Sequence, residues 1–272
     1  MGIVVRSSLE ANNANKNLAR TSRNLSRNFE KISSGLRIAR SADDAAGLGV
    51  AEGLKALHRS ADMAARNIND GISIIGVADG AASEVGSILT RLRELAVQSS
   101  SETLASTERA YIAEEALALT DEITRISAVT EFNGIGIGGT STTLDVQVGV
   151  QDVAANRISI VTGDLGALVT TAAVDFTDAA NSQGSISTID DAIDELSAIR
   201  STYGATENRL GNALNNIETF SEANKAAESR IRDADFGIET AALSQNQILQ
   251  QAGVSILAQA KGLNQSALSL LQ

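Results

Sequence analysis

Acid–base or metal chemistry would require a histidine or closely spaced carboxylates in this sequence. The candidates are the single histidine, His58, and the adjacent carboxylates Asp43 and Asp44. One histidine cannot form a histidine-rich metal site or a two-histidine relay within one chain. The two carboxylates lack a neighbouring nucleophile or second titrating group, so we interpret them as favourable charges at the start of a helix. We therefore predict no catalytic, metal-binding or cofactor-binding residue, and no enzyme.

A glycine-rich stretch, "GIGIGG" at residues 134–139, is superficially similar to a phosphate-binding loop. It lacks the Gly-Lys-Ser/Thr ending that such loops need, and no strand–helix–strand pattern surrounds it. We interpret it as a flexible turn that leads into a β-hairpin.

The composition favours helices packed against helices. The chain has 272 residues, no cysteine, proline or tryptophan, and 3% aromatic residues. Aromatic side chains supply much of the burial in a globular core, so this chain must bury small aliphatic faces over a great length. The absence of cysteine excludes disulfides and thiolate metal sites.

The charge is acidic overall and unevenly distributed. The net charge is −11, yet residues 1–42 carry +6 and the remainder −17. This balance argues against a nucleic-acid partner, because phosphate binding needs a clustered positive field. The basic N-terminal segment lacks the Trp and Phe of a membrane-binding helix, so a partner helix is favoured over a membrane surface.

No segment is expected to enter a membrane or to be cleaved as a leader. We find no apolar run close to the roughly 20 residues that span a bilayer. The N-terminal residues lack an apolar core followed by a small-residue cleavage site. The chain is expected to stay in the cytoplasm or to leave by a route that does not use a cleaved leader.

Apolar residues recur every seven positions in four segments, which is typical of coiled-coil helices. The rows are Val4, Ala11, Leu18, Leu25 and Ile32; Leu54, Ala61, Ile68, Ile75, Ala82, Leu89 and Ala96; Ile189, Leu196, Tyr203, Leu210 and Ile217; and Ala242, Leu249, Ile256, Leu263 and Leu270. A connector with Gly35 and Gly47 separates the first two helices.

The middle of the chain has a different pattern. Leu144, Val146, Val148 and Val150 alternate with other residues, and "NRISIV" follows after a short turn, which predicts a β-hairpin at about 139–165. The small, polar and aperiodic stretch at about 168–186 is expected to be an exposed loop.

This nearly palindromic order predicts the fold. It is mainly α, a long antiparallel helical bundle or coiled coil with a small β-hairpin region and with the N- and C-termini paired. We expect a terminal coiled-coil domain of residues 1–42 plus 236–272, and a rod-like domain of residues 43–235. Two thin terminal helices bury too little apolar area to offset chain entropy alone, so neighbouring copies are expected to supply the missing surface.

Several motifs, in the correct order, resemble flagellin, the subunit of the bacterial flagellar filament. They are "ISSGLRIARSADDAAGLGVAEGL", "LTRLRELAVQS", "EFNG", "SRIRDADFGIE" and "QNQILQQAGVSILAQAKGLNQSALSLLQ". The resemblance covers most of the chain and implies a short form without outer domains. It implies a structural protein that self-assembles into a helical filament for swimming motility. The alternatives are the hook–filament junction protein of the flagellum and, from another class, a cytoplasmic helical enzyme or scaffold.

The resemblance also implies partners and a location. Members of the family are extracellular and leave unfolded through the flagellar type III export apparatus, without leader cleavage. The implied partners are further copies of the chain, an export chaperone, and the filament cap and hook-junction proteins.

Two sets of site residues follow. The heptad positions of the terminal helices are expected to carry self-assembly, the first three packing against the last four: Leu18, Leu25, Ile32, Leu249, Ile256, Leu263 and Leu270. The segment "RLRELAVQ" resembles one that the flagellin-sensing Toll-like receptor of animals engages, which implies receptor contacts by Arg91, Leu95 and Glu115. The same face is expected to pack against neighbouring subunits.

Overall fold

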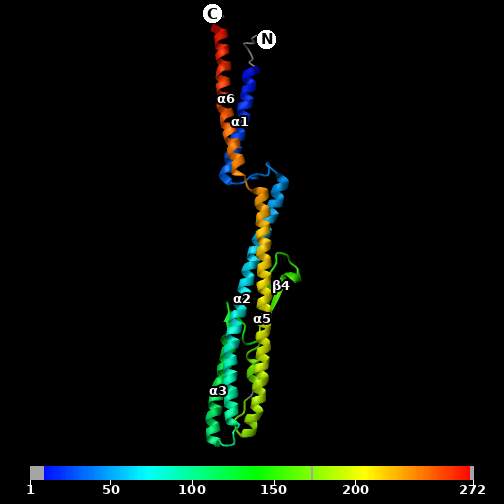
Figure 1. Cartoon of the computed structure of the whole chain (residues 1–272), viewed down its shortest axis with the longest axis vertical. Coiled ribbons are helices and arrows are strands. Elements are labelled where there is room, and N and C mark those ends of the chain that lie inside the picture. Colours follow the sequence, from blue (N-terminus) through cyan, green and yellow to red (C-terminus); the bar gives the residue numbers. More distant parts are fainter. Residues whose placement is uncertain (1–8, 173, 270–272) are drawn as a thin grey trace. The chain divides into compact units, whose positions relative to one another are not determined.

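The computed structural model describes residues 9–172 and 174–269, and most of them are helical (Figure 1). The chain divides into two compact units. We call residues 57–222 the central unit, and the described residues before 57 and after 222 the terminal unit. The long helices α2 (Ala45–Ser99) and α5 (Ala179–Arg232) contribute to both. The division thus falls inside two helices, whereas the sequence places the domain boundaries at the connectors.

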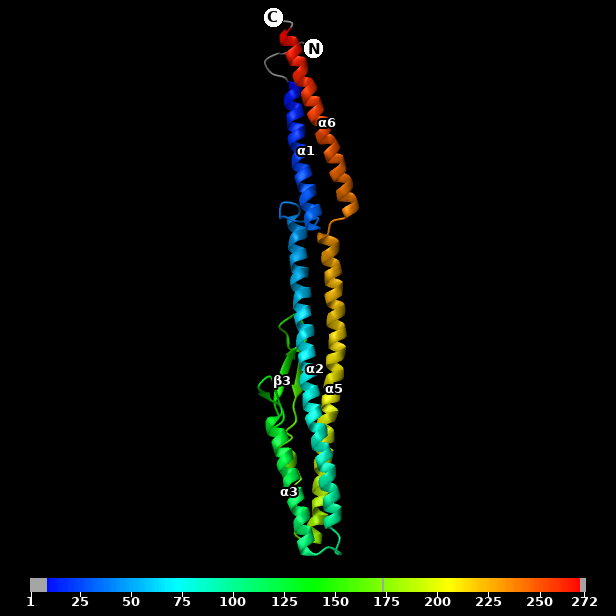
Figure 2. The same cartoon turned by 90° about the vertical axis from the view of Figure 1, so that its left-hand side faces the viewer.

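The terminal unit is built on two antiparallel helices. Helices α1 (Leu9–Ser34) and α6 (Phe236–Ser269) lie side by side in both views (Figures 1 and 2). This confirms the expected pairing of the two ends of the chain.

The central unit packs α2 against α5 and against α3 (Ser106–Val129). The heptad rows read from the sequence form its core: every position from Ala61 to Ala96 in the second row is buried, as is every position from Ile189 to Ile217 in the third. Within the central unit, ion pairs of Arg93 with Asp190 at 2.6 Å and of Arg200 with Asp79 at 2.8 Å join α2 to α5. Arg232 and Glu52, at 2.8 Å, join the same helices within the terminal unit. The mainly α, antiparallel architecture is therefore confirmed.

A β-hairpin lies along the helices of the central unit (Figure 2). Strands β3 (Thr143–Gln147) and β4 (Arg157–Val161) are antiparallel, and a short 3-10 turn, η1 (Ala154–Asn156), precedes β4. Val146, Ile158 and Ile160 are buried, so one face of the hairpin closes the helical core. The hairpin was expected, although its first strand ends before Val148 and Val150.

A second, very short strand pair was not predicted. Strands β1 (Glu131–Phe132) and β2 (Ile135–Gly136) pair through a two-residue turn of Asn133 and Gly134. Both turn residues have positive φ, 50° and 78°, as a tight Asn-Gly hairpin turn requires.

The predicted flexible turn at 134–139 is packed in part: Ile137 and Gly138 are buried, whereas Gly134, Ile135, Gly136 and Gly139 are exposed. Ile137 is buried, and its N–H donates to Thr130 O at 3.0 Å. A Cβ on Gly138 would lie 2.8 Å from Ser127 O. Glycine is needed at position 138 because the backbone passes close to α3, so the expectation of a flexible turn was wrong for this part of the stretch.

The expectation of an exposed loop at 168–186 is also wrong. The short helix α4 (Ala167–Thr171) begins the stretch, and α5 already starts at Ala179. Leu168, Ala172 and Phe176 are buried, and Ser182 Oγ donates to Ser99 Oγ at 3.0 Å. These residues join the core of the central unit. The sequence did not predict this burial, because widely spaced apolar residues can be buried without forming a regular pattern.

One window of α2 is long and apolar enough to cross a bilayer by length and composition alone, contrary to the expectation that no run approaches that length. Core helices also pass this test. In α2, 28% of that window is buried, and the heptad positions from Ala61 to Ala96 pack against the rest of the central unit.

Candidate functional site

The terminal helices meet along a seam of half-buried side chains. On α1 the seam includes Leu18, Leu25 and Ile32, all half-buried as expected from their heptad positions. On α6 the half-buried residues include Gln250, Gly253 and Leu257. A Cβ on Gly253 would lie 3.2 Å from Leu18 Cδ1, so the two helices approach closely at this glycine.

The predicted seam residues of α6 are not on this face. Leu249 is 49% exposed and Ile256 is 56% exposed. Each precedes a half-buried position by one residue, which is a rotation of about 100° around a helix. The expectation that they pack against α1 of the same chain is therefore wrong. Leu263 lies in α6, but its side chain is outside the described residues, as is Leu270 altogether.

Helix α6 exposes large apolar side chains on more than one side. They are Phe236, Ile238, Ile248, Leu249, Val254 and Ile256, and we call them the outer apolar residues of α6. Only Glu239 and Lys261 are charged among the residues of this helix. Burying exposed apolar side chains is favourable, and the described residues of the single chain leave these six uncovered, so α6 presents a surface suited to a contact with another chain.

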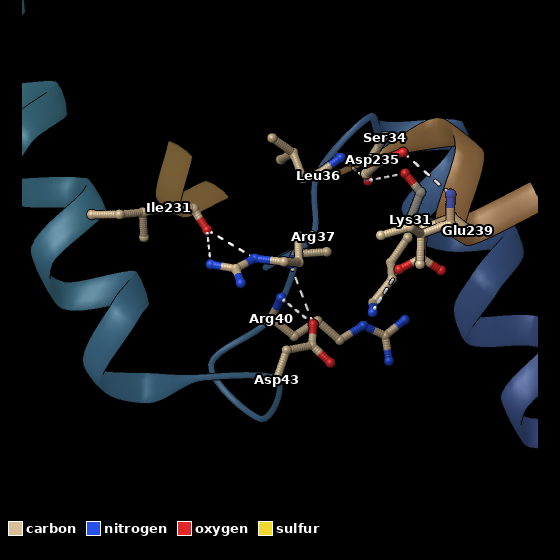
Figure 3. Close-up of polar contacts among 11 residues, drawn as sticks. Lys31, Ser34, Leu36, Arg37, Arg40, Asp43, Ile231, Asp235 and Glu239 are labelled. Atoms are coloured by element: carbon tan, nitrogen blue, oxygen red, sulfur yellow. Dashed lines mark hydrogen bonds and ion pairs between the residues drawn. The ribbon is translucent and has the colours of Figure 1, made fainter. Parts of the chain in front are cut away.

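The two connectors that lead to α1 and α6 are hydrogen-bonded to each other. Arg37 N donates to Arg232 O at 2.7 Å, and the Arg37 guanidinium Nε donates to Ile231 O at 3.1 Å (Figure 3). Ala234 N donates to Gly35 O at 2.9 Å, and Lys31 Nζ lies 3.1 Å from Glu239 Oε1. These contacts hold the start of α6 against the end of α1.

The acidic residues of these connectors cap backbone N–H groups. Asp43 Oδ2 accepts from Arg40 N at 3.0 Å, and Asp44 Oδ1 accepts from Gly47 N at 2.9 Å (Figure 3 shows the first). Asp235 Oδ1 accepts from Gly237 N at 2.8 Å. The prediction that Asp43 and Asp44 mark a helix start is confirmed for Asp44, since α2 begins at the next residue.

The residues expected to contact a receptor lie in different environments. Arg91 donates to Glu115 Oε1 at 2.8 Å and to Glu94 Oε2 at 2.9 Å, on the exposed surface where α2 and α3 meet. The hydrogen bond with Glu115 raises the pKa of Arg91. Leu95 is 1% exposed. It is a core residue, so the expectation that it touches a partner directly was wrong.

No group of three or more histidine and carboxylate side chains suited to a metal ion occurs in the described part of the chain. Three surface features stand out in the described part of the chain. They are the outer apolar residues of α6, the two connectors that are hydrogen-bonded to each other, and the Arg91–Glu115 ion pair.

Two protein-family models match this chain. The bacterial flagellin N-terminal helical region matches residues 5–137, and the bacterial flagellin C-terminal helical region matches residues 186–271. Together they cover the helices α1, α2, α3 and α6 and most of α5.

Individual relatives match over nearly the whole length. Flagellin of Halalkalibacterium halodurans is 42% identical over 99% of this chain and 100% of its own. Flagellin of Bacillus subtilis is 36% identical, and the match covers 90% of this chain and 92% of that protein. The flagellar filament 33 kDa core protein of Treponema phagedenis is 34% identical, and the match covers 99% of this chain and 100% of that protein. The crystal structure of Bacillus cereus flagellin matches with a TM-score of 0.51 at 29% identity, over 56% of this chain and 88% of that one.

Proposed function

Because the chain belongs to the bacterial flagellin family, we propose that its copies assemble into the flagellar filament through their terminal helices. The chain is a structural subunit of that filament, located at the extracellular surface. The proposed assembly residues are Leu18, Leu25 and Ile32 in the seam between α1 and α6, with Leu249, Ile256, Leu263 and Leu270 contacting neighbouring copies.

The exposure of α6 is the observation that carries this proposal. A single chain leaves Leu249 and Ile256 about half exposed on a helix with almost no charge. When one face of a copy contacts a different face of the next copy, each copy is rotated relative to the previous one. If each copy is also shifted along the rotation axis, the chain of copies does not close into a ring and forms an open helical filament. Burying a fully exposed side chain of this size contributes roughly 1.5–3 kcal/mol, so covering the exposed half of Leu249 or Ile256 between copies contributes about half of that amount.

Seeded polymerisation tests the assignment. Purified chains with Ile256→Glu or Leu249→Glu are mixed with short filament seeds and followed by electron microscopy. We expect no elongation, because a buried unpaired carboxylate is strongly unfavourable. Gln247→Glu, an exposed position of the same helix, is the matched control and should elongate. Normal tubes from both apolar variants would refute the role of these residues.

The same assay separates the filament subunit from a junction protein. A polymerising subunit lengthens the seeds into long tubes. Seeds that stay short, with the added chain bound only at their ends, would indicate the hook–filament junction role instead.

We further propose that the chain leaves the cell through the flagellar type III export apparatus, with an export chaperone and without leader cleavage. The filament cap and the hook-junction proteins would then contact the two ends of the polymer. Secreted protein that begins at Met1 or Gly2, and its loss from the medium when the export apparatus is deleted, are the expected results. A shortened N-terminus on the secreted chain would contradict the proposal.

Arg91 and Glu115 are proposed to contact the flagellin-sensing Toll-like receptor when monomers meet an animal host. Their exposed guanidinium–carboxylate pair supports this proposal, and Arg91 can make bidentate contacts that lysine cannot. Arg91→Lys in the monomer should reduce receptor activation roughly tenfold. Arg125→Lys, which alters another exposed arginine–glutamate pair, is the control. Equal activation by parent and Arg91→Lys would remove Arg91 from the contact.

Flagellins are structural proteins, and we propose no catalytic activity for this chain. Turnover of a substrate that depends on His58 would contradict this.

A further inference from the structure

The tip of the β1–β2 hairpin carries two neighbouring residues that can react with each other. Asn133 and Gly134 form its two-residue turn, and both are exposed. The sequence contains no other asparagine that is followed by glycine. A Cβ on Gly134 would meet nothing within 4 Å, so the backbone nitrogen of Gly134 has no side chain to shield it from the side-chain carbonyl carbon of Asn133.

The two reacting groups are also free of hydrogen bonds that would hold them apart. Neither the side-chain amide of Asn133 nor the N–H of Gly134 is hydrogen-bonded to any residue that the structure describes. The amide of Asn133 can therefore turn towards the backbone, and the nitrogen of Gly134 is available as a nucleophile once it loses its proton.

The other described asparagines are restrained. Asn156 lies in η1, its Nδ2 donates to Gln151 O at 3.0 Å, and the bulky side chain of Arg157 follows it. The remaining ones lie in α-helices, where the ladder of backbone hydrogen bonds fixes both the asparagine and the N–H of the next residue. Asn133 is thus the position where ring closure meets the least resistance.

The hairpin can open at its tip while its base stays in place. Strands β1 and β2 have two residues each and pair with no further strand in the described ranges. An isolated two-stranded hairpin is marginally stable in water. At the base, Ile137 is buried and its N–H donates to Thr130 O at 3.0 Å, whereas Ile135 near the tip is 44% exposed. Local opening lets Asn133 leave the turn conformation, which ring closure requires, without unfolding the central unit.

We propose that Asn133 is a site of spontaneous modification, at which the folded chain converts this asparagine to a mixture of aspartate and isoaspartate. The Gly134 nitrogen loses its proton and bonds to Cγ of Asn133, and the side-chain amide leaves as ammonia. A five-membered succinimide ring results. Water then opens the ring at Cγ, which gives aspartate, or at the backbone carbonyl carbon, which gives isoaspartate. The whole reaction consumes one water and releases one ammonia, and it needs no oxidant, cofactor or enzyme.

The products change the hairpin tip. Both add a carboxylate close to the exposed Glu131. Isoaspartate also routes the backbone through the former side-chain carbon, so the chain no longer fits a turn in which both residues have positive φ. We expect residues 131–136 to lose their strand pairing while α3 and the buried Ile137 stay in place. The reaction depends on the hairpin tip alone and not on the filament-forming function.

Peptide mass spectrometry of the folded full-length chain tests the reaction. Monomers and filaments are incubated at pH 7 and at pH 9, and conversion of amide to acid is followed residue by residue. Asn133 should lose its amide at least roughly tenfold faster than Asn156, the internal control, because only Asn133 can align with the nitrogen that follows it. The rate should rise with pH, since the Gly134 nitrogen attacks after losing its proton. Methylation by an isoaspartyl methyltransferase should label the same peptide.

Two variants separate this chemistry from other causes of the mass change. Asn133→Gly removes the reactive amide and keeps a residue that favours this turn, so the peptide should gain neither mass nor methyl label. Asn133→Gln keeps an amide but requires a six-membered ring, which closes much more slowly, and it should also stay unmodified. Conversion at position 133 that persists in Asn133→Gln would overturn the succinimide route.

Hydrogen exchange tests the structural consequence. Chains that carry the added charge are separated by ion exchange, and amides 131–136 should exchange faster in them than in the parent, while those of α3 are unchanged. Equal exchange in the two forms would overturn the loss of strand pairing. An Asn133 that stays intact in the folded chain and reacts only in urea would overturn the site, as would equal conversion of Asn133 and Asn156.

Discussion

Tyr203 shows how one residue of a heptad row can carry more than apolar burial. Its position in the third row predicts a core residue, and the ring is indeed buried. The phenol oxygen also accepts a hydrogen bond from Gly163 N at 2.8 Å, which fastens the segment after β4 to α5. Burial raises the pKa of Tyr203 above its ordinary value of about 10, because the charged form loses solvation.

This pKa shift makes the central unit sensitive to alkali. The pKa of Tyr203 is higher in the folded state than in the unfolded state. The contribution of the neutral phenol to the free energy of unfolding is therefore fully present below pH ~10 and is lost as the pH rises through the folded-state pKa. Tyr203→Phe should remove that loss. At pH 7 the substitution should lower the free energy of unfolding by about 1 kcal/mol, since Gly163 N–H loses its acceptor.

The measurement is urea unfolding of the parent and variant between pH 7 and 11. Tyr111→Phe is the control, because Tyr111 is exposed and is the only other tyrosine of the chain. Parallel stability curves for the parent and Tyr203→Phe would contradict the assignment.

At the scale of elements, glycine decides where the hairpin can lie on α2. Gly71 occupies a core position of the helix, and a Cβ there would lie 3.1 Å from Val146 Cγ2 of β3. The same Cβ would lie 3.4 Å from Ile160 Cδ1 of β4 and from Leu210 Cδ1 of α5. The missing side chain thus makes room for both strands. Gly76, one and a half turns further along, has open space around it.

The two glycines give a matched prediction. Gly76→Ala should raise the free energy of unfolding by about 0.5–1 kcal/mol, because alanine is the better helix former. Gly71→Ala should lower it by about 1 kcal/mol, since crowding against buried neighbours costs more than the helix gains. Urea unfolding of both variants measures the difference. Equal stabilisation by the two substitutions would show that the hairpin does not press on α2 at Gly71.

For α6, the heptad spacing predicted the wrong face of the helix as the one that packs against α1. The row through Leu249 and Ile256 is regular, yet the seam with α1 runs through Gln250, Gly253 and Leu257. Large apolar residues on several sides of a helix give more than one plausible seam. Which seam is used depends on how closely the partner helix approaches, and small residues such as Gly253 allow the closest approach.

At the scale of the whole molecule, the apolar core is distributed very unequally between the two units. Among the described residues of the terminal unit, only Ile38 and Ala51 are buried apolar side chains. All other buried apolar side chains belong to the central unit. Hydrophobic burial is the dominant favourable term in folding, so the terminal helices of a single chain are marginally stable.

This distribution predicts two separate thermal transitions for the monomer. The terminal helices should unfold at a lower temperature than the central unit, and assembly should raise that lower transition, because neighbours bind only the folded helices. Hydrogen exchange provides the residue-level measurement. Amides of α1 and α6 should exchange rapidly in monomers and slowly in filaments, while those of α2 between Ala61 and Ala96 stay protected in both. A single cooperative transition of the monomer would contradict this division.

The sequence by itself determined the four long helices, although not the start of α5, and also the antiparallel pairing of the chain ends, the hairpin and the family. The heptad rows of α2 and α5 are long and regular, so their buried faces followed from spacing alone, and the family motifs required no coordinates. The tertiary structure decided what is exposed. It buried Leu95, Leu168 and Phe176, and it left Leu249 and Ile256 about half exposed. The physical reason is that sequence periodicity specifies which side of a helix is apolar, whereas exposure depends on which neighbouring element covers that side.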